Sequence, residues 1–173
     1  MCSSDLVSHE TTREISVWSP DGTGPWPVVY ALHGLGGHHT ELAELATQLA
    51  SNGILVFSAQ HSAPDWAATQ QNVECGYRFV RTIAEDHGGD LDLPVTFLGF
   101  SVGATLALEH GLSEEAYGSE GLFTGCFDGA PRPDVIVPIS GCHYEFAGTR
   151  FPFESTGWTN LDAHLVLIAG EQD

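Results

Sequence analysis

Apolar residues occur in short continuous runs that alternate with helix-like patterns along most of the chain. A continuous apolar run bounded by glycine or polar residues is typical of a strand buried on both faces, whereas strict alternation is typical of a strand buried on one. The alternating kind is predicted at Glu14–Trp18. Strands of the continuous kind are predicted at Val28–Leu32, Ile54–Phe57, Val95–Leu98, Asp134–Ile139 and His164–Ala169.

Three segments have the apolar spacing of helices. The first follows Thr40, a residue suited to an N-cap, and ends before Gly53, where a C′ glycine is expected. Its apolar positions are Leu42, Leu45, Ala46 and Leu49. The other two helices are predicted at Val73–Asp86 and Ala104–His110, and the polar segment Ser58–Asn72 is predicted to be a long loop.

Strands that are apolar throughout and alternate with helices predict an α/β fold, with a mostly parallel sheet covered by helices on both faces. A chain of 173 residues is expected to form one domain. Sheets of this kind bind ligands at the carboxyl ends of their strands. Four residues with useful chemistry follow predicted strands at that edge: His61, Ser101, His143 and Asp173.

The chain is strongly acidic, with 23 Asp and Glu residues against 5 basic ones and a formal net charge of −18. A surface of this sign repels nucleic-acid phosphates and anionic lipids, so neither is expected as a partner. All five basic residues are arginine, which removes the lysine-dependent phosphate loop of nucleotide hydrolases. No apolar run is long enough for a membrane span.

Neither a metal ion nor any other cofactor is predicted. The four cysteines form no C-x-x-C pair, and the adjacent His38 and His39 point in different directions, which makes a poor metal-binding pair. A disulfide among Cys75, Cys126 and Cys142 stays open at this point.

The two ends of the sequence suggest a partial reading frame. Residues 1–6 resemble a translated sequencing adapter, so residues 7–173 are assigned to the domain, which we expect to be incomplete at its C-terminus. Residues 1–10 contain no apolar core of a signal peptide. A cytoplasmic location is therefore expected, although a missing native N-terminus would leave secretion open. The oligomeric state is not predicted.

Residues 99–103 read Gly-Phe-Ser-Val-Gly, a G-x-S-x-G motif between a predicted strand and a predicted helix. A serine in this context lies on a sharp turn that raises its hydroxyl, and the glycines let neighbouring backbone pass close by. Ser101 is therefore the candidate nucleophile. Its hydroxyl would need a base to accept its proton and hydrogen-bond donors to stabilise the oxyanion that it forms.

Residues 32–37 read Leu-His-Gly-Leu-Gly-Gly and follow a predicted strand. With this loop, the motif at 99–103 and the final Gly-Glu-Gln-Asp, the chain resembles the α/β-hydrolase superfamily, in particular serine carboxylesterases and dienelactone-hydrolase-like proteins. The resemblance implies the α/β-hydrolase fold, with its last strand and helix missing, and hydrolysis of carboxylic esters through an acyl-enzyme. It also implies an oxyanion hole formed by the N–H groups of Leu35 and Val102, with His33 holding the loop.

The same resemblance implies a triad in the chain order serine, acid, histidine. Asp173 follows the last predicted strand and is the predicted acid, with Glu171 as the alternative. The histidine base is expected beyond residue 173. His61 and His143 are weaker substitutes for it and are instead predicted to line the substrate pocket.

The predicted pocket residues are His61, Trp66, Phe100 and His143. Neutral esters are the predicted substrates, because the acidic surface disfavours anions. A serine nucleophile argues against dienelactone hydrolases proper, which carry cysteine, and haloalkane dehalogenases, which carry aspartate. Two other classes stay open: a non-catalytic hydrolase-like protein that binds small molecules, and a nucleotide-binding α/β domain suggested by the glycine loop.

Overall fold

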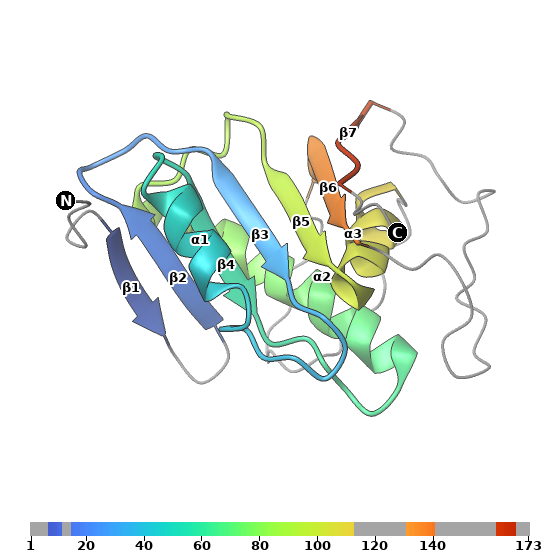
Figure 1. The fold of residues 1–173 in the computed structure, drawn as a ribbon. Coiled ribbons are helices and arrows are strands. Elements are labelled where there is room, and N and C mark those ends of the chain that lie inside the picture. The colour runs from blue at the N-terminus through green and yellow to red at the C-terminus, as the bar shows by residue number, and fades with distance from the viewer. Residues whose placement is uncertain (1–6, 12–14, 113–130, 141–161, 169–173) are drawn as a thin grey trace, which may run out of the picture.

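A seven-stranded sheet forms the centre of the described part of the chain (Figure 1). The structure is a computed structural model that describes residues 7–11, 15–112, 131–140 and 162–168. The strand order is β1-β2-β4-β3-β5-β6-β7, with β1 and β2 antiparallel to their neighbours and the other pairs parallel. The strands are β1 Val7–Thr11, β2 Ile15–Pro20, β3 Val28–Leu32, β4 Leu55–Ala59, β5 Thr96–Phe100, β6 Val135–Ile139 and β7 His164–Leu165. The predicted mostly parallel sheet is confirmed.

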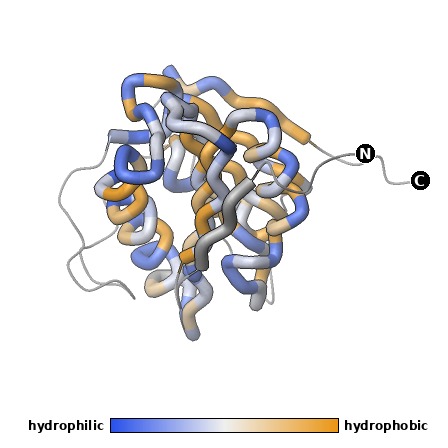
Figure 2. The backbone as a smooth tube through the Cα atoms, turned by 90° about the vertical axis from the view of Figure 1, so that its left-hand side faces the viewer, coloured by the Kyte–Doolittle hydropathy of each residue, from blue (hydrophilic) through white to orange (hydrophobic). Residues whose placement is uncertain are grey.

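Helices cover both faces of this sheet, as predicted. They are α1 Ala43–Ala50, α2 Trp66–Ile83, the short 3-10 helix η1 Glu85–His87 and α3 Val102–Leu112. Successive residues of a strand point to opposite faces. Val29 of β3 therefore packs in a cluster with Ala46 of α1, whereas Tyr30 packs in a second cluster with Tyr77 of α2 and Leu106 of α3. Figure 2 shows hydrophobic and hydrophilic residues mixed along the backbone of the described part of the chain.

The strand order brings together segments that are far apart in the sequence. β5 lies between β3 and β6, with Leu32 opposite Gly99 and Phe100 opposite Ile139. The loop that follows β3 and the turn that follows β5 therefore start side by side at the carboxyl edge of the sheet. The site is built at this edge.

Two helix boundaries differ from the sequence prediction. α1 begins at Ala43, and its N-cap is Leu42, which makes no side-chain capping bond, so Thr40 is not the cap. The loop predicted from Ser58 to Asn72 is shorter at both ends. β4 continues to Ala59 at its start, and α2 already begins at Trp66 at its end. The start of α2 is fixed by Asp65, whose carboxylate accepts a hydrogen bond from the N–H of Ala68 (2.8 Å).

The two edges of the sheet also differ from the prediction. β1 was not predicted, since Val7–Thr11 is mostly polar; it is a strand because it pairs along its length with β2. The run predicted at His164–Ala169 pairs with β6 as a ladder only over His164–Leu165, followed by one isolated bridge at Ile168.

Two further features complete the fold. Cys75 of α2 is buried and disulfide-bonded, to a partner outside the described residues. Among the residues that the structure describes, no helix combines the length and apolar character of a membrane span.

Candidate active site

Ser101 occupies a sharp turn between β5 and α3. Its φ of 55° lies in the left-handed region, which costs a non-glycine residue about 1–3 kcal/mol. Its N–H donates to the carbonyl oxygen of Ile139 in β6 (2.9 Å), and its own carbonyl oxygen accepts from the N–H of Ala104 in α3 (3.0 Å). The neighbouring strand and the following helix thus hold the serine in a strained conformation, in the strand-turn-helix context that the sequence predicted.

The two glycines of the motif are required by close backbone contacts. A Cβ on Gly99 would overlap the carbonyl oxygen of Gly103. A Cβ on Gly103 would overlap the carbonyl oxygen of Leu32 and lie 2.6 Å from that of His33. These neighbours are backbone atoms, which cannot rotate away as a side chain can. α3 therefore starts in direct contact with the end of β3.

The glycine loop, residues 34–37, lies beside the Ser101 turn. A Cβ built on Gly34 would be 3.7 Å from the Cβ of Ser101. The carbonyl oxygen of Gly34 accepts hydrogen bonds from Nδ1 of His33 (2.9 Å) and from the N–H of Gly37 (3.1 Å). His33 is fully buried, and burial lowers its pKa, so it holds the loop as a neutral imidazole with its proton on Nδ1. This is the structural role predicted for it.

Two backbone N–H groups beside the turn have no hydrogen-bond acceptor in the part of the chain that the structure describes. Among the described residues, neither the N–H of Leu35 nor that of Val102 donates a hydrogen bond. Val102 is the first residue of α3, where N–H groups have no acceptor within the helix. The N–H of Leu35 belongs to the same peptide unit as the carbonyl of Gly34, so the two bonds to that oxygen orient and polarise it. Both groups are therefore available to donate hydrogen bonds to an acceptor atom of a ligand.

A pocket of about 270 Å³ lies beside these groups, and Leu35 and Val102 both line it. Of the predicted pocket residues, His61 and Trp66 line it, whereas Phe100 is 39% exposed at the end of β5 and is not among the lining residues. The one charged residue among the described lining residues is Asp65, whose carboxylate is occupied in capping α2. The pocket therefore suits an uncharged ligand.

His61 shapes the pocket but is poorly suited to act as a base. Its ring stacks on that of His33, with centroids 3.8 Å apart. Burial, and then the neighbouring His33, lower the pKa of His61 to about 3. A general base is most effective when its pKa is near the working pH, so this imidazole accepts a proton reluctantly.

Several predicted site residues lie outside the described part of the chain. These are the acid Asp173, its alternative Glu171 and the pocket residue His143. Within the described residues, the hydroxyl of Ser101 has no hydrogen-bond partner, and no group of three His, Cys, Asp or Glu side chains could hold a metal ion.

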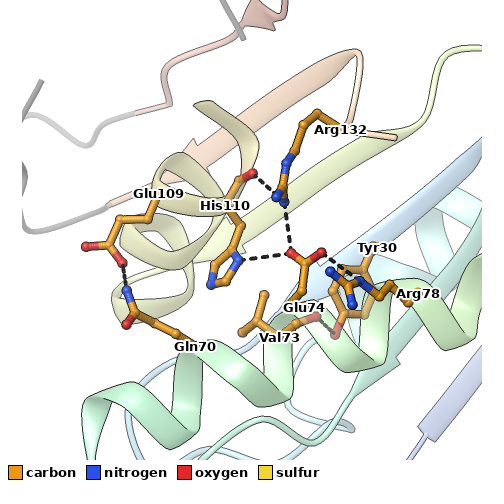
Figure 3. A network of polar contacts seen from close by, with 8 residues as sticks. All are labelled: Tyr30, Gln70, Val73, Glu74, Arg78, Glu109, His110 and Arg132. Atoms are coloured by element: carbon orange, nitrogen blue, oxygen red, sulfur yellow. Dashed lines mark hydrogen bonds and ion pairs between the residues drawn. The ribbon is translucent and has the colours of Figure 1, made fainter. Parts of the chain in front are cut away.

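A buried ionic network joins α2 to α3 (Figure 3). Glu74 of α2 is 1% exposed, and its carboxylate accepts hydrogen bonds from Arg78 (3.0 Å) and Arg132 (2.8 Å). Nδ1 of His110 in α3 lies 3.4 Å from the same carboxylate. Burial alone would raise the pKa of Glu74, but its bonds to His110 and Arg132 outweigh burial and lower it to about 2. Glu74 is therefore a permanent buried anion.

The sequence analysis missed this network and one further carboxylate, Glu41, which accepts a hydrogen bond from the N–H of Gly34 (2.9 Å). The spacing of Glu74 and Arg78, four residues apart in a helix, was the local signal for the network. Nothing local connects Glu41 to Gly34, because the contact depends on how the chain turns back after the loop.

Comparison with known proteins places this geometry in a known fold. No family model matches the sequence. A monoglyceride lipase homolog from monkeypox virus is 29% identical over 150 residues, which cover 81% of this chain and 51% of that protein. An inhibitor-bound esterase B from Lactobacillus rhamnosis superimposes with a TM-score of 0.64 at 20% identity, over 79% of this chain and 50% of that chain.

A second solved structure, a thermophilic esterase from the planctomycete Thermogutta terrifontis with propionate bound, matches with a TM-score of 0.59 at 13% identity. The match covers 80% of this chain and 56% of that chain. The chain thus spans about half the length of the proteins it matches. Together with the sheet order and the turn at Ser101, these likenesses show that the chain has the α/β-hydrolase fold.

Proposed function

We propose that this chain is the part of a serine hydrolase that carries the nucleophile, and that the whole protein cleaves neutral carboxylic esters. The observation that carries the proposal is that three features occur together at the Ser101 turn: the serine, two N–H donors and a pocket. A strained serine lies next to Leu35 and Val102, whose N–H groups have no acceptor among the described residues. Both of these residues line a pocket whose one charged residue among the described lining residues, Asp65, caps α2. Structural strain of this kind persists where function requires it.

The chemistry follows from these groups. The Ser101 oxygen attacks the ester carbonyl carbon while a base takes its proton, and the carbonyl oxygen becomes an oxyanion. The N–H groups of Leu35 and Val102 stabilise that oxyanion, and one such donor is worth about a hundredfold to a thousandfold in rate. The tetrahedral intermediate expels the alcohol, which takes the proton from the base. Water then hydrolyses the acyl-enzyme by the same steps and regenerates Ser101.

The remaining parts of the triad complete the proposal. We further propose that Asp173 orients the base and that the base is a histidine beyond residue 173. The described histidine in the pocket, His61, has a pKa of about 3 and is a poor proton acceptor. The similar proteins, two esterases and a monoglyceride lipase homolog, support an ester as the substrate. Trp66 and the mostly uncharged lining of the pocket, in which the Asp65 carboxylate caps α2, favour a neutral ester with an apolar acyl group.

The test uses the whole protein that contains this chain. A fluorophosphonate probe is expected to label it at Ser101, located by peptide mass spectrometry, and hydrolysis of p-nitrophenyl butyrate is expected to disappear in Ser101→Ala. A non-catalytic binding protein of the same fold would bind esters but leave Ser101 unlabelled and the ester intact. Hydrolysis that continues unchanged in Ser101→Ala would overturn the proposal.

A further inference from the structure

We infer that Glu41 is a positioning residue that holds the glycine loop, residues 34–37, in the conformation that presents the N–H of Leu35 to substrate. The inference rests on the proposed function and deepens it. Glu41 follows the loop at the start of the turn that leads to α1, where its own N–H donates to the carbonyl oxygen of His38 (2.8 Å). Its side chain turns back from there onto the loop.

The first support is the hydrogen bond that the Glu41 carboxylate accepts. The N–H of Gly34 donates to its Oε2 atom at 2.9 Å, within a partly buried contact. The bond adds to the two that the Gly34 carbonyl oxygen accepts from His33 and Gly37. Both the N–H and the carbonyl of Gly34 are therefore fixed, one on each side of its Cα. The next N–H along the chain, that of Leu35, is left unused.

The second support is the space that the loop provides for this carboxylate. A Cβ on Gly37 would overlap Oε2 of Glu41 and lie 2.9 Å from Nδ1 of His33. A Cβ on Gly34 would be 3.7 Å from Oε2 of Glu41 and also 3.7 Å from the Cβ of Ser101. Gly34 therefore lies close to both the Glu41 carboxylate and Ser101, and a shift of the loop would move Leu35 relative to Ser101.

The contribution of Glu41 is its acceptor oxygen rather than its charge. A negative charge close to an oxyanion site opposes the charge that develops there, so it cannot itself assist the reaction. An oxygen acceptor of the right length holds the loop whether or not it is ionised. Glutamine at position 41 should therefore replace glutamate, whereas a shorter or apolar side chain should not.

The test compares three substitutions with a matched control in the whole protein. Glu41→Ala removes the acceptor, Glu41→Asp draws it back by one methylene, and Glu41→Gln keeps it without charge. The control is Glu44→Ala, which removes an exposed carboxylate from the first turn of α1 that has no hydrogen-bond partner among the described residues. The readouts are kcat and KM for p-nitrophenyl butyrate and hydrogen exchange of the Gly34 amide by NMR.

Loss of positioning is expected to lower kcat in Glu41→Ala and Glu41→Asp by about tenfold to a hundredfold, with KM changed by less than about twofold, because the lost interaction acts in the transition state. Glu41→Gln and Glu44→Ala are expected to stay within about threefold of the unmodified protein. The Gly34 amide should exchange faster only in the alanine and aspartate variants.

Two results would overturn the inference: equal kcat in Glu41→Ala and Glu44→Ala, or a Glu41→Gln variant as slow as Glu41→Ala. A failure of the proposed function looks different, because hydrolysis would then not depend on Ser101 in any variant. In that case the Gly34 amide still decides the role of Glu41. Unchanged exchange in Glu41→Ala overturns it, and faster exchange supports a loop held by this carboxylate.

Discussion

Replacing Glu74 by glutamine keeps the shape of a buried side chain and removes its charge. The carboxylate is 1% exposed and accepts hydrogen bonds from Arg78 and Arg132 at 3.0 and 2.8 Å (Figure 3). An amide at this position can still accept one of these bonds, but its NH₂ group would face a guanidinium. Arg78 and Arg132 would then both lose the ionised partner that Glu74 provides.

The pKa of Glu74 sets the magnitude of this effect. Burial acts to raise the pKa, but the bonds to His110 and Arg132 lower it from 4.5 to about 2. A shift of this size corresponds to about 3 kcal/mol of folding free energy. The unfolded chain binds the proton more tightly, so this stability is present above about pH 4.5 and is lost as the pH falls towards 2. For a domain of this length, about 3 kcal/mol lowers Tm by about 6–12 °C.

Urea unfolding followed by circular dichroism measures the effect. At about pH 7, the free energy of unfolding of Glu74→Gln is expected to be about 3 kcal/mol lower than that of the unmodified protein. At about pH 3 this difference is expected to be less than half as large. The exposed carboxylate of Glu44 supplies the control, because Glu44→Gln should change stability by less than about 0.5 kcal/mol. A Glu74→Gln variant as stable as the control at neutral pH would refute the reasoning, as would a difference that does not depend on pH.

By contrast, two further substitutions should each relieve an unfavourable feature of the folded state. Burial raises the pKa of Glu109 to about 7 against the opposing bond from Gln70, so the folded state keeps the proton and loses stability as the pH rises from 4.5 to about 7. In urea unfolding, the free energy of unfolding of Glu109→Gln relative to that of the unmodified protein should therefore rise by about 3 kcal/mol between about pH 4 and pH 8. A difference between the two proteins that stays constant with pH would contradict this. Glycine at position 101 adopts the positive φ without strain, so the free energy of unfolding of Ser101→Gly should be about 1 kcal/mol higher than that of Ser101→Ala. Neither variant should react with a fluorophosphonate. Equal Tm values for the two variants would show that the turn is not strained.

The sheet was predicted well from the sequence because its central strands are buried on both faces. Val28–Leu32 is apolar throughout and ends at a glycine loop, and the structure gives the same bounds. The errors fall where packing or capping overrides local pattern. β1 is a strand because it pairs with β2, although its own residues are mostly polar. The start of α2 is set by the cap at Asp65, within a polar stretch that has little apolar periodicity.

Those residues of the candidate site that belong to short sequence motifs could be predicted from the sequence. The motif around Ser101 and the loop around Leu35 each identify one group, and the sheet then brings the two together. Contacts made only by folding were not predictable. The carboxylate of Glu41 binds Gly34, seven positions earlier in irregular chain. The carboxylate of Glu74 binds Arg132, fifty-eight positions later in the sequence. Neither spacing follows a helical or strand repeat.

The ionic network and the Ser101 turn are connected through α3. This helix is buried along Gly103–Leu112, so it is covered on all sides and hydrophobic packing alone does not determine its rotation. Polar contacts do: His110, at its C-terminal end, is bound to Glu74 of α2. At the other end, Gly103 lies against the backbone of Leu32, which leaves the helix little freedom to slide. Since Val102 begins this helix, the direction of its N–H depends on the orientation of α3 over the sheet. A buried charge that costs free energy to desolvate is therefore best explained as a device that specifies the orientation of α3 over the sheet.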